Sequence, residues 1–275
     1  MSMVRLVLLM IVMVGGLSAQ RYQLRDGTVL SASEVTLRGG VLDHATDLPG
    51  GQGAVERSYP LAQVARLDWP EPVELGEARQ QLRTGDAVGS LATLEPMLRQ
   101  FTPLAKVPGS WWTAAKRVSL QGLMMLGETT VAAQAARELI AIATDAEAVG
   151  LARLALVELE ARNGRPEIAR AMLTAVAAAD VPPAVQARAW LLHGDLALTR
   201  GETEEAIEAY LHIPVFHGTH EDLLPAALLG SARAFRSHGD PARADRAVSE
   251  LIDSHADTAE AATAIREFNL DTPAL

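Results

Sequence analysis

The stretch that decides the fold lies near the C-terminus, where residues 187–210 read ARAWLLHGDLALTRGETEEAIEAY and residues 225–251 read PAALLGSARAFRSHGDPARADRAVSEL. The two segments align when Gly201 is placed on Gly239, and in each the glycine separates two apolar helical segments. Within His238–Pro241 (HGDP), the glycine suits the left-handed residue that ends a helix, the aspartate suits an N-cap, and the proline suits the first helical position. The sequence therefore predicts a repeated pair of helices.

A glycine in the same role recurs through most of the chain, at positions 85, 127, 164, 201 and 239, with spacings of 42, 37, 37 and 38 residues. Periods of this length are typical of solenoids, in which each unit packs on its neighbours. If each glycine holds position 15, the repeats begin at Glu71, Thr113, Gly150, Ala187 and Pro225. Small residues then fall at positions 8 and 20, where we expect the paired helices to approach closely: Gly194, Ala232, Ala132, Ala169, Ala206 and Ala244.

Large residues occupy the complementary positions, with Trp190 at position 4, Phe235 at position 11 and Tyr210 at position 24. This pattern resembles the tetratricopeptide repeat (TPR) family over residues 71–268, most closely in the fourth and fifth repeats. The resemblance implies a mainly α fold, a right-handed α-solenoid of about five helix pairs that ends in a capping helix over residues 257–268.

The resemblance also implies that a protein or peptide partner binds on the concave face, which the first helix of each pair lines. That face takes positions 2, 5, 9, 12 and 13 of each repeat, where the polar candidates are Arg79, Arg117, Gln121, Glu158, Arg162, Asp195, Arg233 and Arg236. We expect Arg162, Arg233 and Arg236 to form one basic groove suited to a carboxylate-bearing segment. The subtype of the family that clamps a C-terminal carboxylate with asparagines is disfavoured, because neither Asn163 nor Asn269 holds such a position.

The N-terminal part has a different pattern. Residues 20–69 contain short alternating segments, an Asp26-Gly27 turn and a glycine-rich loop at residues 49–53, which predict a small β module of SH3-like type. The prolines of Pro70–Pro72 mark the junction with the helices. The predicted domains are therefore a signal peptide (1–19), the β module (20–69), the TPR-like repeats with their capping helix (71–268) and a tail (269–275).

The first 19 residues have the layout of a signal peptide. Arg5 precedes the nine apolar residues 6–14, and small residues lead to a cleavage site after Ala19. The apolar run is shorter than the about 20 residues that a spanning helix needs. With no cysteine in the chain, lipidation and disulfides are excluded. We expect a periplasmic or secreted protein without stable membrane insertion after cleavage, and a retained anchor is the alternative.

The charge argues against nucleic acid as a partner. The formal net charge is −10, and only Lys106 and Lys116 of the 24 basic residues are lysines. The basic residues form no cluster along the chain, whereas binding to phosphates depends on concentrated positive charge. Trp111-Trp112 is expected to lie half in the core and half at the entrance of a helix, and Met124-Met125 is expected to pack in the core, although either pair offers an alternative binding surface.

No motif of an enzyme or of a cofactor site is present, so we expect neither catalysis nor a cofactor. Residues 212–222 (HIPVFHGTHED) are the one cluster of ligand-type side chains. We interpret the cluster as an exposed insertion between helices. A metal-dependent hydrolase that uses His217 and His220 is one alternative function, and a ligand- or glycan-binding protein that acts through the β module is another.

The sequence therefore predicts an exported, non-enzymatic scaffold or adaptor for protein–protein interaction in the cell envelope. In this respect the chain resembles periplasmic TPR proteins of the outer-membrane assembly and Tol-Pal systems. It differs from those proteins because it has no cysteine to lipidate and carries a β module before the repeats.

Overall fold

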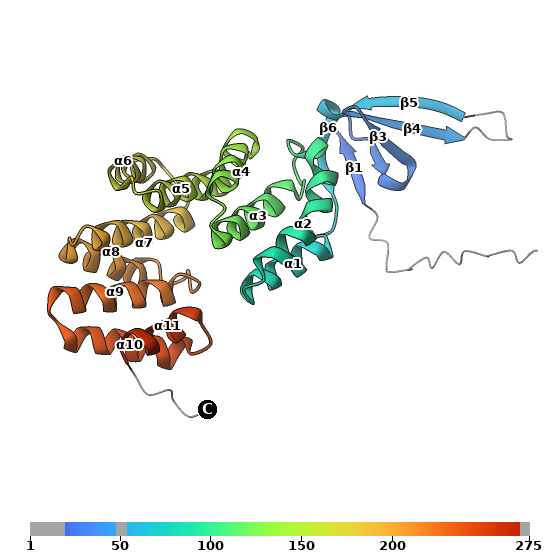
Figure 1. The fold of residues 1–275 in the computed structure, drawn as a ribbon. Coiled ribbons are helices and arrows are strands. Elements are labelled where there is room, and N and C mark those ends of the chain that lie inside the picture. The colour runs from blue at the N-terminus through green and yellow to red at the C-terminus, as the bar shows by residue number, and fades with distance from the viewer. Residues whose placement is uncertain (1–19, 48–53, 270–275) are drawn as a thin grey trace, which may run out of the picture.

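The computed structural model describes residues 20–47 and 54–269, so the expected signal peptide, the loop at residues 49–53 and the tail beyond Asn269 lie outside the described residues. Strands come first and helices follow (Figure 1). The described strands are β1 Arg21–Leu24, β2 Val29–Ser31, β3 Val35–Arg38, β4 Val41–Asp47, β5 Ala54–Pro60 and β6 Val64–Asp68. The described α-helices are α1 Val73–Arg83, α2 Ala87–Phe101, α3 Trp112–Leu126, α4 Thr129–Ile142, α5 Ala146–Arg162, α6 Pro166–Ala177, α7 Pro183–Thr199, α8 Thr203–Phe216, α9 Leu224–His238, α10 Pro241–His255 and α11 Ala259–Glu267.

The strands form two antiparallel sheets of three strands each, with the orders β2-β1-β6 and β3-β4-β5. Along β1 the exposed and buried side chains alternate, and Tyr22 and Leu24 point into the core. The β4–β5 ribbon extends away from the helices in Figure 1. The SH3-like assignment of the β module stays a prediction.

The β module shares its core with the helices. Tyr22, Leu42 and Leu67 belong to the same buried cluster as residues of α1 to α5. The Trp69 ring lies edge-on to the rings of Tyr22 and Phe101, each at a centroid distance of 5.5 Å. The strands therefore cover the apolar face that the first helix pair would otherwise expose, as the terminal unit of a solenoid must.

The segment between α2 and α3 fastens this junction. The backbone N–H of Leu67 on β6 donates to the carbonyl of Pro108 at 2.7 Å, and Trp111 Nε1 donates to the carbonyl of Trp69 at 3.2 Å. Gly109 has a φ of +81°, and a Cβ there would lie 2.3 Å from the Leu67 carbonyl oxygen. Only glycine fits this approach without strain. As expected, Trp111 and Trp112 serve the structure, since Trp112 is also buried.

The helices form a TPR-like solenoid, and within the described residues five antiparallel pairs, α1–α2 to α9–α10, are followed by α11. The five glycines at positions 85, 127, 164, 201 and 239 all have positive φ and lie at the turns inside the pairs. The alanines predicted at close approaches, Ala132, Ala169, Ala206, Ala232 and Ala244, are at most 1% exposed. The predicted register of the repeats is therefore confirmed.

Tyr210 shows how closely the pairs pack. Its ring is buried on α8, and it lies between Gly194 on α7 and Gly230 on α9. A Cβ on Gly194 would lie 2.6 Å from the ring, and a Cβ on Gly230 would lie 2.4 Å from it. The Tyr210 hydroxyl donates to Asp195 Oδ1 at 2.7 Å. The ring is thus fixed on both faces and at its end.

The expected insertion at residues 212–221 needs a correction. Helix α8 continues through Pro214 to Phe216, so His212 is helical and the turn to α9 begins at His217. Ile213 is fully buried, and the N–H of His217 donates to its carbonyl at 2.8 Å. The packing of Ile213 outweighs the helix hydrogen bond that the proline cannot make.

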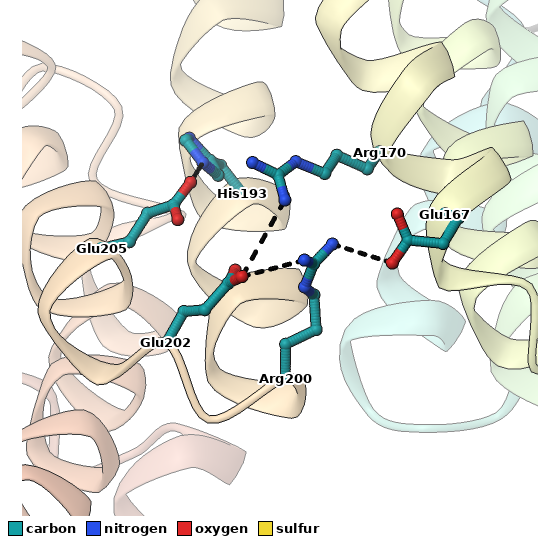
Figure 2. A network of polar contacts seen from close by, with 6 residues as sticks. All are labelled: Glu167, Arg170, His193, Arg200, Glu202 and Glu205. Atoms are coloured by element: carbon teal, nitrogen blue, oxygen red, sulfur yellow. Dashed lines mark hydrogen bonds and ion pairs between the residues drawn. The ribbon is translucent and has the colours of Figure 1, made fainter.

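Ion pairs connect the third and fourth helix pairs (Figure 2). The Arg200 guanidinium contacts Glu167 at 3.0 Å and Glu202 at 2.9 Å, and Arg170 lies 3.9 Å from Glu202. These contacts link α6 to the turn between α7 and α8. In the part of the chain that the structure describes, no helix has the length and apolarity that would let it traverse a lipid bilayer.

Candidate functional site

A groove on one face of the solenoid is the candidate site. The first helices of the first four pairs, α1, α3, α5 and α7, line it, and its volume is about 520 Å³. Side chains of four successive pairs meet there, so the register of the repeats determines which residues line the groove. Its polar lining residues are Arg79, Arg117, Gln121, Glu158, Arg162 and Arg188.

The floor of the groove is apolar. Leu151, Leu192 and the two methionines of α3 contribute to it. Met124 is buried, as expected, but Met125 is 48% exposed and lies in the groove rather than in the core. A methionine side chain is flexible and polarizable, so this floor can adapt to apolar side chains of different shapes.

Charged side chains surround this floor. Arg162 on α5 donates to Glu158 at 2.5 Å and to the carbonyl of Met124 at 2.8 Å. Arg188 on α7 lies 3.8 Å from the same Glu158, so two guanidiniums share one carboxylate.

The remaining arginines pair beyond the lining of the groove. Arg117 on α3 pairs with Glu147 at 3.2 Å, and Arg79 on α1 pairs with Glu71. The four arginines of the groove thus face three glutamates, a local excess of positive charge on a chain whose net charge is −10.

Asp195 lies outside the residues that line this groove. Solvent reaches its side chain, yet the surrounding helices desolvate the carboxyl and raise its pKa, while the hydrogen bond from Tyr210 and the charge of Arg188 oppose that shift. The same burial raises the pKa of the Tyr210 hydroxyl. Two more distant charges also act on the Asp195 carboxyl: Glu158 raises its pKa and Arg233 lowers it.

Arg233 and Arg236 on α9 contact the capping helix instead of Arg162. Arg233 donates to both carboxylate oxygens of Glu267, at 2.8 and 2.5 Å, and this contact raises its pKa. Arg236 donates to the Glu267 carbonyl at 3.0 Å, and its guanidinium lies 4.0 Å from the centre of the Phe268 ring. The expected basic groove of Arg162, Arg233 and Arg236 is therefore not formed. Both arginines of α9 instead contact residues at the C-terminal end of α11.

Sequence reasoning missed Arg188 and the apolar floor of the groove, which includes Met125. Arg188 holds position 2 of its repeat, one of the positions assigned to the concave face, so the register contained the signal. Met125 holds position 13 of the second repeat, but its apolar character favoured a core position. Arg79, Arg117, Gln121, Glu158 and Arg162 were predicted for the concave face, and the structure brings these five together.

The arrangement is suited to binding. Over residues 20–47 and 54–269, no group of three or more His, Asp or Glu side chains is placed to hold a metal ion. The imidazoles of His217 and His220 are 6.3 Å apart between ring centroids, and His217 faces the His212 ring at 5.5 Å. The metal-dependent hydrolase therefore gains no support from the described residues.

Comparison with known proteins supports the TPR family for the helical part. Residues 154–213, from within α5 to near the end of α8, match the family model described as tetratricopeptide repeat. No curated protein matches the chain.

Several solved structures are similar to the chain at low sequence identity. The TPR-like repeats described as those of a Podosopora anserina kinesin light chain share 13% identity and a TM-score of 0.45, with 72% of this chain and 96% of that chain covered. MamA protein shares 15% identity and a TM-score of 0.40, with 74% and 96% covered. YrrB, described as a TPR protein with an unusual peptide-binding site, shares 12% identity and a TM-score of 0.39, with 70% and 90% covered.

Proposed function

We propose that this protein is a non-enzymatic scaffold that binds a segment of a partner protein in the groove along α1, α3, α5 and α7. The groove is the observation that carries the proposal. Its volume of about 520 Å³ lies in the range of about 300–1,000 Å³ typical of ligand sites. It also combines an apolar floor with a small number of charged groups, which is the usual composition of such sites.

The partner chemistry follows from that composition. An apolar side chain of the bound segment would lie on the floor formed by Met125, Leu151 and Leu192. Carboxylates of the segment would meet Arg117 and Arg188, whose present partners are 3.2 and 3.8 Å away and partly exposed. Guanidiniums form strong, charge-assisted hydrogen bonds with carboxylates. We therefore favour an acidic segment with one bulky apolar residue.

The proposal includes export to the periplasm or the medium. Its support is the sequence of residues 1–19, which lie outside the described residues. A role in the cell envelope, of the kind that periplasmic TPR proteins of outer-membrane assembly or Tol-Pal systems have, is part of the same proposal. Mass spectrometry of the native protein would test it, because cleavage after Ala19 is expected and an intact N-terminus would contradict export.

Site-specific photo-cross-linking tests the binding site. A photoreactive phenylalanine analogue at Met125 would face the groove, and the same analogue at Val131 on α4 is the control. The two positions are matched, since Met125 is 48% and Val131 is 49% exposed. In cells of the source organism we expect a discrete adduct from Met125 and none from Val131. Adducts from Val131 alone would place binding elsewhere, and the proposal would then fail.

A further inference from the structure

Four of the seven histidines lie in one aromatic column together with Trp190. The Trp190 ring on α7 stacks on the His212 ring on α8, with centroids 3.9 Å apart and planes 19° apart. His193 lies beside Trp190 at 5.7 Å. Beyond His212, the column continues through His217 at 5.5 Å to His220 at a further 6.3 Å.

This arrangement disfavours positive charge on His212 and His217. Burial lowers the pKa of His212. Its Nδ1 atom is buried and has no hydrogen-bond partner among the described residues. Burial, followed by the charges of His212 and His220, lowers the pKa of His217. A second proton in the column would place two positive charges within about 6 Å, where they repel each other.

The charged and titratable side chains on the helices around α8 contact residues other than His212 and His217. From α7, His193 contacts Glu205 at 2.6 Å and Asp195 accepts from Tyr210. From α9, Arg233 pairs with Glu267, and the His238 ring contacts the Thr203 hydroxyl at 3.2 Å. From α6, Arg170 lies near Glu202.

The nearest carboxylates in sequence are those of Glu208, one helical turn before His212, and of Glu221 and Asp222 in the turn to α9. All three residues are exposed, and among the described residues no ion pair connects them with the imidazoles of the column. Protonation of His212 or His217 therefore gains no ion pair with these carboxylates in the closed structure, as far as the described residues go.

After the buried Ile213, the last turn of α8 has few buried side chains, and the Phe216 ring lies against the His212 ring with centroids 4.4 Å apart. Pro214 has no N–H to donate within α8, and the next two side chains, Val215 and Phe216, are 67% and 69% exposed. Segments with few buried apolar contacts open locally at low cost in free energy. The last turn of α8 is thus the part of the fourth helix pair that repulsion in the column would open first.

We propose that this imidazole column is a pH-sensitive hinge: protonation below about pH 6 opens the last turn of α8 and loosens the junction between the fourth and fifth helix pairs. Burial lowers the pKa of His212 and His217 in the closed turn, so these two imidazoles bind protons less readily there than in the open turn. The stability of the closed turn is therefore fully present above the ordinary histidine pKa of 6.5 and decreases as the pH falls below it. The hinge is independent of the groove, because none of its histidines lines the groove.

Hydrogen exchange of the mature protein tests the hinge. Protection of the amides from Ile213 to Leu224 would be compared at about pH 7.5 and about pH 5.5, after correction for the intrinsic exchange rate. We expect protection of this segment to fall at the lower pH relative to that of α5, because protonation favours the open turn. An equal fall in both segments would overturn the proposal.

Two variants assign the effect to the column. His217→Gln removes the central imidazole, and His212→Phe retains a ring against Trp190 but cannot be protonated. Either variant is expected to keep the segment protected at the lower pH, and His255→Gln on α10 is expected to behave as wild type. If His217→Gln opens the turn already at about pH 7.5, that variant has lost a structural contact, and His212→Phe then shows whether the pH dependence comes from the column. Wild-type pH dependence in His212→Phe would overturn the proposal.

Discussion

Replacement of Gly194 by alanine tests the packing of the solenoid. The added Cβ would lie 2.6, 2.7 and 2.8 Å from three atoms of the Tyr210 ring. The ring has no free direction in which to move, because Gly230 lies against its other face and Asp195 holds its hydroxyl. The helices α7 and α8 must therefore separate. Gly76 on α1 is the control, since a Cβ there meets nothing within 4 Å.

Two contributions to the free energy of unfolding matter here, one shared by both substitutions and one specific to Gly194→Ala. Alanine is favoured over glycine inside a helix by about 1 kcal/mol, and both variants gain this amount. Overpacking in a dense interior costs about 1–3 kcal/mol, and only Gly194→Ala bears this cost. We therefore expect Gly194→Ala to be less stable than Gly76→Ala by about 1–3 kcal/mol. Valine at Gly194 adds further bulk and is expected to be worse than alanine.

Thermal unfolding followed by far-ultraviolet circular dichroism measures this difference. For a chain of this size, 1 kcal/mol corresponds to roughly 2–4 °C in Tm, so Gly76→Ala should melt roughly 2–12 °C above Gly194→Ala. If Gly194→Ala melts at or above Gly76→Ala, the close approach of α7 and α8 at Tyr210 is wrong, and with it the assigned repeat register.

Three further predictions concern other contacts. Gly150→Ala is expected to be less stable than Gly76→Ala by about 1–3 kcal/mol, because its Cβ would lie 2.6 Å from Val185, and Val185→Ala should rescue it in a double-mutant cycle. Trp69→Ala is expected to cost about 3 kcal/mol in chemical unfolding, and a loss that is confined to the β module would contradict the shared core. The hydrogen bond from His193 lowers the pKa of Glu205, so Glu205 stabilises the fold above its ordinary pKa of 4.5 and less as the pH falls below it. Glu205→Gln should therefore lower the free energy of unfolding at neutral pH by less than about 1 kcal/mol and leave it unchanged at about pH 3, whereas an equal effect at both pH values would contradict the pair.

The helix pairs were predictable because their turns depend on a local requirement. A glycine with positive φ ends the first helix of each pair, and the sequence has such a glycine at each of the five turns. The alternation of buried and exposed residues along β1 is equally local. Five of the polar candidates line the groove because the register of the repeats fixes which residues of each first helix face it.

The remaining features depend on contacts between distant residues. The pair of Arg233 with Glu267 joins residues 34 positions apart, and no local pattern indicates that α11 turns back onto α9. The extension of α8 beyond Pro214 depends on the burial of Ile213 by its neighbours, which outweighs the preference of proline. Met125 is exposed because the concave face remains open at that point, which composition does not reveal.

The affinity for the cross-linked partner segment is the most direct test of binding in the groove. A synthetic peptide of that segment would be titrated by calorimetry into the wild type and into two matched double variants. Gln121→Ala with Met125→Ala changes the groove, whereas Gln134→Ala with Val131→Ala changes the same kinds of side chain on α4. We predict that the groove variant raises the Kd about tenfold or more, which corresponds to about 1.4 kcal/mol, while the α4 variant leaves it unchanged. Equal Kd values for all three proteins, or a loss of affinity in the α4 variant alone, would contradict the account.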